Sequence, residues 1–281
     1  MNAEETRKVV REGYTEVAKK GGLVAGNSCC GPNTSQNTVA KGGGASCCAP
    51  SVSAENISQA IGYSATQLQE IPDSANLGLG CGNPTALAEI KEGDVVLDLG
   101  SGAGIDVFLA SKQVGPTGKV IGVDMTDEML AKARKNAETG GYTNVEFRKG
   151  VIEELPVDSD TVDLIISNCV INLSPEKDKV FQEAHRVLKP GGQIMVSDIV
   201  ILRDLPDAIK DSLDAYVGCI SGAEKIEDYK AAISDAGFTD IEILSQDNFG
   251  SEIAGTYLNL TVDENVDVEN LAASIKVRAR K

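Results

Sequence analysis

Residues 95–110, VVLDLGSGAGIDVFLA, contain the pattern from which the fold class is inferred. This segment begins as an apolar strand, continues as a loop in which Gly100, Gly102 and Gly104 alternate with small residues, and ends in a helix. Glycines let a backbone turn sharply and approach a ligand closely. Asp124 ends the next strand-like run about 24 residues later, where a carboxylate can accept hydrogen bonds from both ribose hydroxyls. Together these features predict a site for a nucleotide-type ligand.

On the C-terminal side of these residues, apolar runs of strand length continue to alternate with helical patterns. The runs are DVVLDLG, KVIGVD, NVEFRKG, VDLIISN and QIMVSDIV, and the helical patterns include TDEMLAKARKNAE and SPEKDKVFQEAHRVLK. In the second helix we expect Ser174 as N-cap, Pro175 at the first helical position and a stop at residues 189–192. Strands that are apolar on both faces and alternate with helices predict a doubly wound α/β fold with a parallel sheet.

The ends of the chain differ from this core. Val10, Tyr14 and Val17 have helical spacing, whereas residues 21–53 are rich in Gly, Ser, Asn and Cys and predict a flexible arm. The final AASIKVRARK alternates as a closing strand does. We therefore expect a helix and cysteine-rich arm over residues 1–60, a ligand-binding core over 61–245, and an acidic connection with the closing strand over 246–281.

Composition excludes several classes of function. The 281 residues include 42 acidic and 26 basic side chains, and the resulting net charge of −16 disfavours nucleic acids and anionic membranes as partners. No apolar run reaches the roughly 20 residues of a membrane span, and the N-terminus lacks the apolar segment of a secretory signal. Seven cysteines in such a chain predict a reducing, cytoplasmic location. A single histidine argues against mechanisms built on histidine bases.

The glycine spacing G-x-G-x-G, with Asp98 two residues before it, resembles the first motif of class I S-adenosylmethionine methyltransferases. GVIEELP, ISNCVINL and RVLKPGGQIMVSD resemble later motifs of that superfamily, so the resemblance covers residues 77–243 and outweighs an NAD site or a site without a ligand. It implies a mostly parallel, seven-stranded Rossmann-like sheet whose final strand is antiparallel. The cofactor-binding residues that it implies are Asp98, Gly100, Ser101, Gly102, Gly104, Asp124, Met125, Ile152, Glu153 and Asn168.

Within that set, the resemblance assigns the methionine moiety to the loop Gly100–Gly104 and the ribose to Asp124. Met125 and Ile152 would flank adenine, with Glu153 beside it. Many members of the superfamily carry an acidic residue at the position of Val151, which this chain lacks. We therefore expect backbone and packing to hold adenine here.

Three cysteines belong to segments that can meet at the ligand edge of the sheet. Cys81 precedes the first strand, Cys169 follows the fourth, and Cys219 lies in DAYVGCISGA after the fifth. Converging thiolates suit a soft, thiophilic centre. Trivalent arsenic bound by three sulfurs keeps an unshared electron pair for attack on a methyl group, and no general base is needed. Considered singly, Cys169 and Cys219 would more often be small buried core residues than ligands.

The segments NLGLGCGNP, ISNCVINLSP and YVGCISGA closely resemble the arsenite methyltransferases. This resemblance implies that Cys81, Cys169 and Cys219 bind As(III), and that Cys47 or Cys48 is a further reactive cysteine. It also implies transfer from S-adenosylmethionine to arsenite or its thiol conjugates, with a disulfide opened by a thiol reductant such as thioredoxin or glutathione. We expect a monomer. The alternatives are a small-molecule C- or O-methyltransferase and an arsenic-binding protein without activity.

Overall fold

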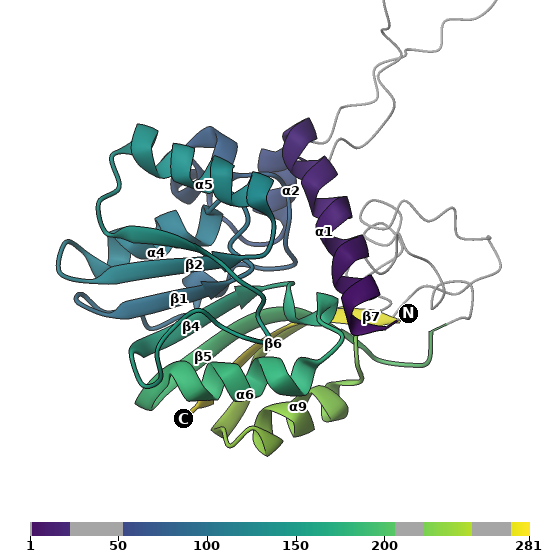
Figure 1. Ribbon diagram of the computed structural model, residues 1–281. Coiled ribbons are helices and arrows are strands. Elements are labelled where there is room, and N and C mark those ends of the chain that lie inside the picture. The colour runs from purple at the N-terminus through teal and green to yellow at the C-terminus, as the bar shows by residue number, and fades with distance from the viewer. Residues whose placement is uncertain (1, 23–52, 206–221, 249–270) are drawn as a thin grey trace, which may run out of the picture.

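A computed structural model describes residues 2–22, 53–205, 222–248 and 271–281 (Figure 1). Its centre is a seven-stranded sheet in the order β3-β2-β1-β4-β5-β7-β6. The strands are β1 Val95–Leu99, β2 Lys119–Asp124, β3 Val145–Lys149, β4 Val162–Asn168, β5 Leu188–Ile201, β6 Thr239–Asn248 and β7 Ala272–Arg280. Strands β1 to β5 pair in parallel, whereas β7 lies antiparallel between β5 and β6. The predicted fold class and the antiparallel closing strand are both confirmed.

Helices cover both faces of this sheet (Figure 1). The helices α4 Ile105–Val114 and α5 Asp127–Gly140 pack on one face, and α6 Lys177–Val187 and α9 Ile226–Asp235 pack on the other. Alternate strand residues supply the two cores: Leu97 belongs to the α6–α9 side and Val96 to the α4–α5 side. This alternation explains why the strand sequences are apolar throughout.

Several short helices precede β1. They are α2 Ala54–Ala60, α3 Ala65–Gln69 and the 3-10 turns η1 Asp73–Ala75 and η2 Pro84–Ala86; a third 3-10 turn, η3 Ile171–Leu173, follows β4. Tyr63 and Leu68 bury their side chains in the α4–α5 core. The chain from residue 53 onward is therefore packed against the sheet before β1 begins.

The predicted N-terminal helix is α1, Ala3–Lys20. Asn2 and Glu5 form a capping box at its start, and Gly21 ends it in a left-handed conformation. Val10 and Ala18 are 1% and 0% exposed, so one face of α1 is buried against the rest of the molecule. Thr15 also donates a 3.2 Å hydrogen bond to Glu128 of α5.

One predicted helix boundary is wrong. Helix α6 begins at Lys177 with Glu176 as its N-cap, so Pro175 is not its first residue and Ser174 is not its cap. The Ser174 hydroxyl instead donates to Glu153 at 2.7 Å and accepts from the Glu176 amide at 3.1 Å. The stretch at residues 189–192 follows the end of the helix, as expected, but it forms the start of β5.

Candidate functional site

The glycine loop between β1 and α4 has the backbone that the sequence predicts. Gly100, Gly102 and Gly104 all have positive φ, at 67°, 53° and 102°, a region that side chains rarely tolerate. A Cβ atom at Gly100 would come within 2.4 Å of the Val170 side chain, whereas one at Gly102 would meet nothing within 4 Å. The loop is therefore tightly packed at its first glycine and open at its second, where a ligand can approach the backbone.

Asp124 ends β2 beside this loop. One of its carboxylate oxygens accepts from the Gly102 amide at 2.9 Å and the other from the Thr126 amide at 2.8 Å. These bonds fix the carboxylate at the rim of the loop and leave each oxygen further capacity to accept. The position agrees with the predicted ribose contact, which stays a prediction.

Three buried carboxylates, those of Asp98, Asp106 and Asp124, lie close enough to interact around the loop. Burial raises the pKa of Asp98 well above its ordinary value, and the charges of Asp106 and then Asp124 raise it further. Burial also raises the pKa of Asp106 to about 6, although hydrogen bonds from Tyr63 and Asn168 oppose the shift. A cationic ligand would relieve this concentration of negative charge. S-adenosylmethionine, with its sulfonium and ammonium groups, is such a ligand.

Ser101 adds a second sign of a ligand. Its hydroxyl is buried and has no hydrogen-bond partner in the described part of the chain. A buried hydroxyl without a partner costs free energy unless a ligand or water completes its bonding. The residues of the loop therefore fit the predicted cofactor.

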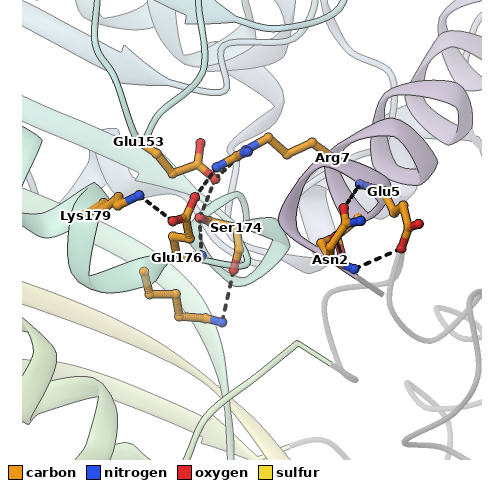
Figure 2. A network of polar contacts seen from close by, with 9 residues as sticks. Asn2, Glu5, Arg7, Glu153, Ser174, Glu176 and Lys179 are labelled. Atoms are coloured by element: carbon orange, nitrogen blue, oxygen red, sulfur yellow. Dashed lines mark hydrogen bonds and ion pairs between the residues drawn. The ribbon is translucent and has the colours of Figure 1, made fainter.

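On the predicted adenine side, Glu153 is engaged by other residues. Its carboxylate accepts from Ser174 and from Arg7 Nε, the latter at 3.1 Å, and Arg7 also pairs with Glu176. Figure 2 shows Arg7 reaching from α1 to both acids. Glu153 thus ties α1 to the core, and its predicted place beside adenine stays a prediction.

The other two adenine candidates are partly or wholly covered. Ile152 belongs to the core beneath α6, and Met125 is half-buried beside the cluster that contains Val10. Their contacts with adenine also stay predictions.

Two of the predicted arsenic ligands meet in space. The sulfurs of Cys81 and Cys169 and a carboxylate oxygen of Asp198 all lie within 4.8 Å of one another, and all three residues are buried. Neither cysteine is in a disulfide. Cys169 has a φ of 59°, which is uncommon for a residue other than glycine and often marks a functional site.

Asn168 holds the Cys81 loop against the end of β4. Its side-chain oxygen accepts from the Cys81 amide at 3.0 Å, and its Nδ2 donates to the Gly82 carbonyl at 2.7 Å and to Tyr63 Oη at 2.9 Å. Ser274 of β7 donates to the Cys81 carbonyl at 2.7 Å from the other side. The amide of Asn168, predicted to bind the cofactor, is thus used to position Cys81; contact with the cofactor stays a prediction.

Asp198 was not identified from the sequence. It lies in β5, is fully buried, and accepts from the Ile199 amide at 2.9 Å and from Tyr229 Oη at 3.0 Å. Burial raises its pKa to about 7 against the opposing effect of these bonds. A charged residue inside the apolar run QIMVSDIV was the available signal, because a buried acid usually has a partner or a function.

Cys81 and Cys169 lie beside the glycine loop of residues 100–104 (the donor loop). Val170, next in sequence to Cys169, packs against Gly100, and Met125 and Val10 border the cluster that contains both cysteines. The same edge of the sheet therefore carries the glycine loop and the thiols, as expected for the carboxyl ends of parallel strands. Cys219, Cys47 and Cys48 lie outside the described residues.

Comparison with known proteins gives one consistent result. A family model described as a methyltransferase domain matches residues 90–249. An arsenite methyltransferase of Halobacterium salinarum is 43% identical over 99% of this chain and 67% of its own length. A second, of Aquipseudomonas alcaligenes, is 44% identical over 57% of this chain and 48% of its own length.

A solved structure supports the same similarity to arsenite methyltransferases. An arsenic(III) S-adenosylmethionine methyltransferase of Chlamydomonas reinhardtii aligns with a TM-score of 0.59 at 33% identity, covering 80% of this chain and 72% of that one. The chain thus spans between about half and two thirds of the length of the curated relatives named above. With the glycine loop and the paired thiols at one edge of the sheet, these matches place the chain in the arsenite methyltransferase family.

Proposed function

We propose that this chain transfers a methyl group from S-adenosylmethionine to As(III) held by Cys81 and Cys169, with Cys219 as the third sulfur ligand. The observation that carries the proposal is the approach of two thiols from separate segments, neither in a disulfide, to within 4.8 Å of Asp198 and of one another, beside the donor loop. Thiolates are the ligands that soft centres prefer.

The chain's own residues have distinct tasks in this proposal. Gly102 gives a ligand access to the loop backbone, Asp124 offers acceptors for the ribose, and the buried acids favour the positive donor. Cys81 and Cys169 hold arsenic with its unshared pair available. When bound, S-adenosylmethionine supplies the methyl group as an electrophile. Because arsenic carries no proton, no side chain has to act as a base in the transfer.

We also infer a thiol reductant as co-substrate and a reducing location such as the cytoplasm. Methyl transfer to the unshared pair formally oxidises As(III) to As(V), so two electrons must be returned before another cycle. Two thiols that join as a disulfide supply these electrons, and Cys47 or Cys48 is the candidate for one of the two. The thiol reductant then opens that disulfide. Cys81 and Cys169 must remain reduced to bind arsenic, as they are in the structure.

A second candidate function is favoured by Asp198. Methyl transfer to an organic hydroxyl or carbon acid needs a base near the acceptor, and a carboxyl group whose pKa is about 7 could serve. An erythromycin 3''-O-methyltransferase of Saccharopolyspora erythraea is 31% identical over 63% of this chain. This function predicts activity on an organic acceptor after both described cysteines are changed to serine.

The deciding experiment incubates the protein with arsenite, S-adenosylmethionine and a thiol, and follows arsenic species and S-adenosylhomocysteine over time. We expect methylated arsenic and S-adenosylhomocysteine to appear together, and both to be lost in Cys169→Ser. The double variant Cys29→Ser/Cys30→Ser is a control for general loss of thiols. Unchanged arsenite turnover in Cys169→Ser would contradict the proposed ligand set.

A further inference from the structure

The donor set at the acceptor site contains an atom that As(III) does not need. Cys81 and Cys169 supply two sulfurs, and Asp198 supplies an oxygen within 4.8 Å of both. Three thiolates complete a neutral arsenic centre, and a carboxylate beside them adds charge without adding a preferred ligand. Two thiolates and a carboxylate instead form a donor set that zinc-class divalent cations accept.

Asp198 also has the supporting bonds typical of a ligating carboxylate. The Ile199 amide and Tyr229 Oη each donate to one of its oxygens, at 2.9 and 3.0 Å. Tyr229 is itself held edge-on against Phe181, with ring centroids 5.4 Å apart. Such contacts fix the orientation of a carboxylate ligand and still leave each oxygen able to bind a cation.

The charge balance favours a divalent cation as well. Lys177 is a cationic side chain whose charge affects Asp198, and its ammonium already contacts Glu224 at 3.6 Å and the Ser174 carbonyl at 3.3 Å. With both cysteines as thiolates, the three buried groups carry three negative charges. Buried groups of this kind are neutralised either by protonation or by a bound cation, and a zinc-class ion can provide that cation.

A tetrahedral zinc-class site would require the donor atoms of Cys81, Cys169 and Asp198 to move only slightly closer together. In a tetrahedral site with zinc–sulfur bonds of about 2.3 Å, two sulfurs lie roughly 3.8 Å apart. The donor atoms here lie within 4.8 Å of one another, a spread that rotation of the cysteine side chains can reduce. Because the ligands come from the loop before η2, the residue that follows β4 and the C-terminal part of β5, the fold itself brings them together.

We propose that Cys81, Cys169 and Asp198 form a binding site for a zinc-class divalent cation, and that this cation and arsenite exclude each other. Cation binding is independent of the proposed function, whereas the competition with arsenite rests on it. Each site then has its own third ligand: the carboxylate of Asp198 for the divalent cation, and a third sulfur for arsenic.

The test uses cadmium as the probe, followed by the ultraviolet sulfur-to-cadmium charge-transfer band. The protein is the full chain with Cys29, Cys30, Cys47 and Cys48 changed to serine, kept reduced with a phosphine that does not bind as a thiol. We expect one saturable site whose signal is lost when arsenite is added. In this background, Asp198→Asn should lower cadmium affinity at least about tenfold.

The matched control is Asp178→Asn, which removes an exposed carboxylate from α6. Equal cadmium affinity in Asp198→Asn and Asp178→Asn would overturn the proposal, as would simultaneous saturation by cadmium and arsenite. Failure of the proposed function has a different result: cadmium binds as described, and arsenite neither binds nor displaces it.

A second measurement uses the unsubstituted chain and therefore does not require any variant to fold. Alkylation of the unsubstituted chain, mapped by mass spectrometry, should show Cys81 and Cys169 protected together at the same cadmium concentration. Protection of only one of them, or of neither, would overturn the proposal.

Discussion

The donor region and the acceptor region lie at the same edge of the sheet but are built in opposite ways. The donor region, residues 98–106 with Asp124, is mainly one continuous run whose glycines set its shape. The acceptor region consists of Cys81, Cys169 and Asp198, which come from three distant segments and meet through the fold. A local motif therefore specifies the first region, and tertiary packing specifies the second.

The largest effect should come from breaking the acceptor region. We expect Cys169→Ser to lower arsenite methylation by more than about 1,000-fold, because a serine oxygen is a poor ligand for a thiophilic centre. S-adenosylmethionine affinity, measured by calorimetry, should stay within about twofold, because the donor loop is untouched. A parallel loss of donor binding would show that the two regions are not separable.

The donor region can be broken by one methyl group. Gly102 and Gly141 both have positive φ, and a Cβ atom at either would meet nothing within 4 Å. Gly102→Ala and Gly141→Ala should therefore lose similar stability, about 1 kcal/mol. Only Gly102→Ala should also lose donor affinity, by roughly 100-fold, because its methyl group occupies the side from which the ligand approaches. Similar donor affinity in both variants would contradict the assigned loop.

The difference between a local motif and tertiary packing explains which parts of the molecule could be predicted from the sequence. Strands β1 to β5 and β7, helices α1, α4, α5 and α6, and the glycine loop follow from patterns within a few residues, and these were predicted. Strand β6 and helices α2, α3 and α9 were not located from the sequence. Cys81 and Cys169 were predicted through flanking motifs, because no local pattern states that they meet. Asp198 was missed because its importance depends on Cys169 and Cys81, which lie 29 and 117 residues away in sequence.

The helix start was mispredicted for a similar reason. Ser174 followed by Pro175 is a sound local signal for an N-cap. The tertiary contact with Glu153 uses the Ser174 hydroxyl, and the helix begins at Lys177 instead. Local rules fail here where a long-range polar contact competes for the same atom.

Asn168 allows a sharper separation of the two regions. Asn168→Ala should lower arsenite affinity about 10- to 100-fold by releasing the Cys81 loop, as loss of a supporting hydrogen bond does in metal sites. Asn144→Ala is the control, since Asn144 also donates to two backbone carbonyls, those of Ser111 and Gly115, away from the cysteines. A larger loss of donor affinity than of arsenite affinity would instead assign Asn168 to the donor region.

Asp106 lies in the donor region and is linked by hydrogen bonds to the acceptor region, and its ionisation should make the stability of the protein depend on pH. It belongs to the buried acids and accepts from Tyr63 at 2.8 Å, which in turn accepts from Asn168. Burial raises its pKa to about 6 in the folded protein, so folding disfavours its ionised form. The resulting loss of stability is absent below the unfolded pKa, near 4, and complete above about 6.

Asp106→Asn removes this ionisation. The free energy of unfolding of the variant minus that of the parent, from urea titrations, should therefore rise by roughly 1–2 kcal/mol between pH 4.5 and pH 8. A difference that stays constant or falls with pH would mean that Asp106 is not the group responsible.

The smallest effect concerns α1, the element that touches both regions. Its Ala18 packs with Ala103 of the donor loop, and its Val10 packs with the two cysteines. Arg7 fastens the helix to Glu153, whose side chain is only 5% exposed (Figure 2). Arg7→Met keeps most of the apolar stem and should cost about 1 kcal/mol, because a quarter of the Arg7 side chain is exposed and the pair is partly screened.

The consequence for binding distinguishes α1 from a merely stabilising helix. Because α1 packs against both regions, Arg7→Met should weaken donor and arsenite binding by similar factors of about two to five, the same order as the lost stability. Arg11→Met, one turn further along and exposed, should change neither. A loss confined to one ligand would show that α1 serves that region alone, and hydrogen exchange of the α1 amides in the two variants would show whether the helix has loosened.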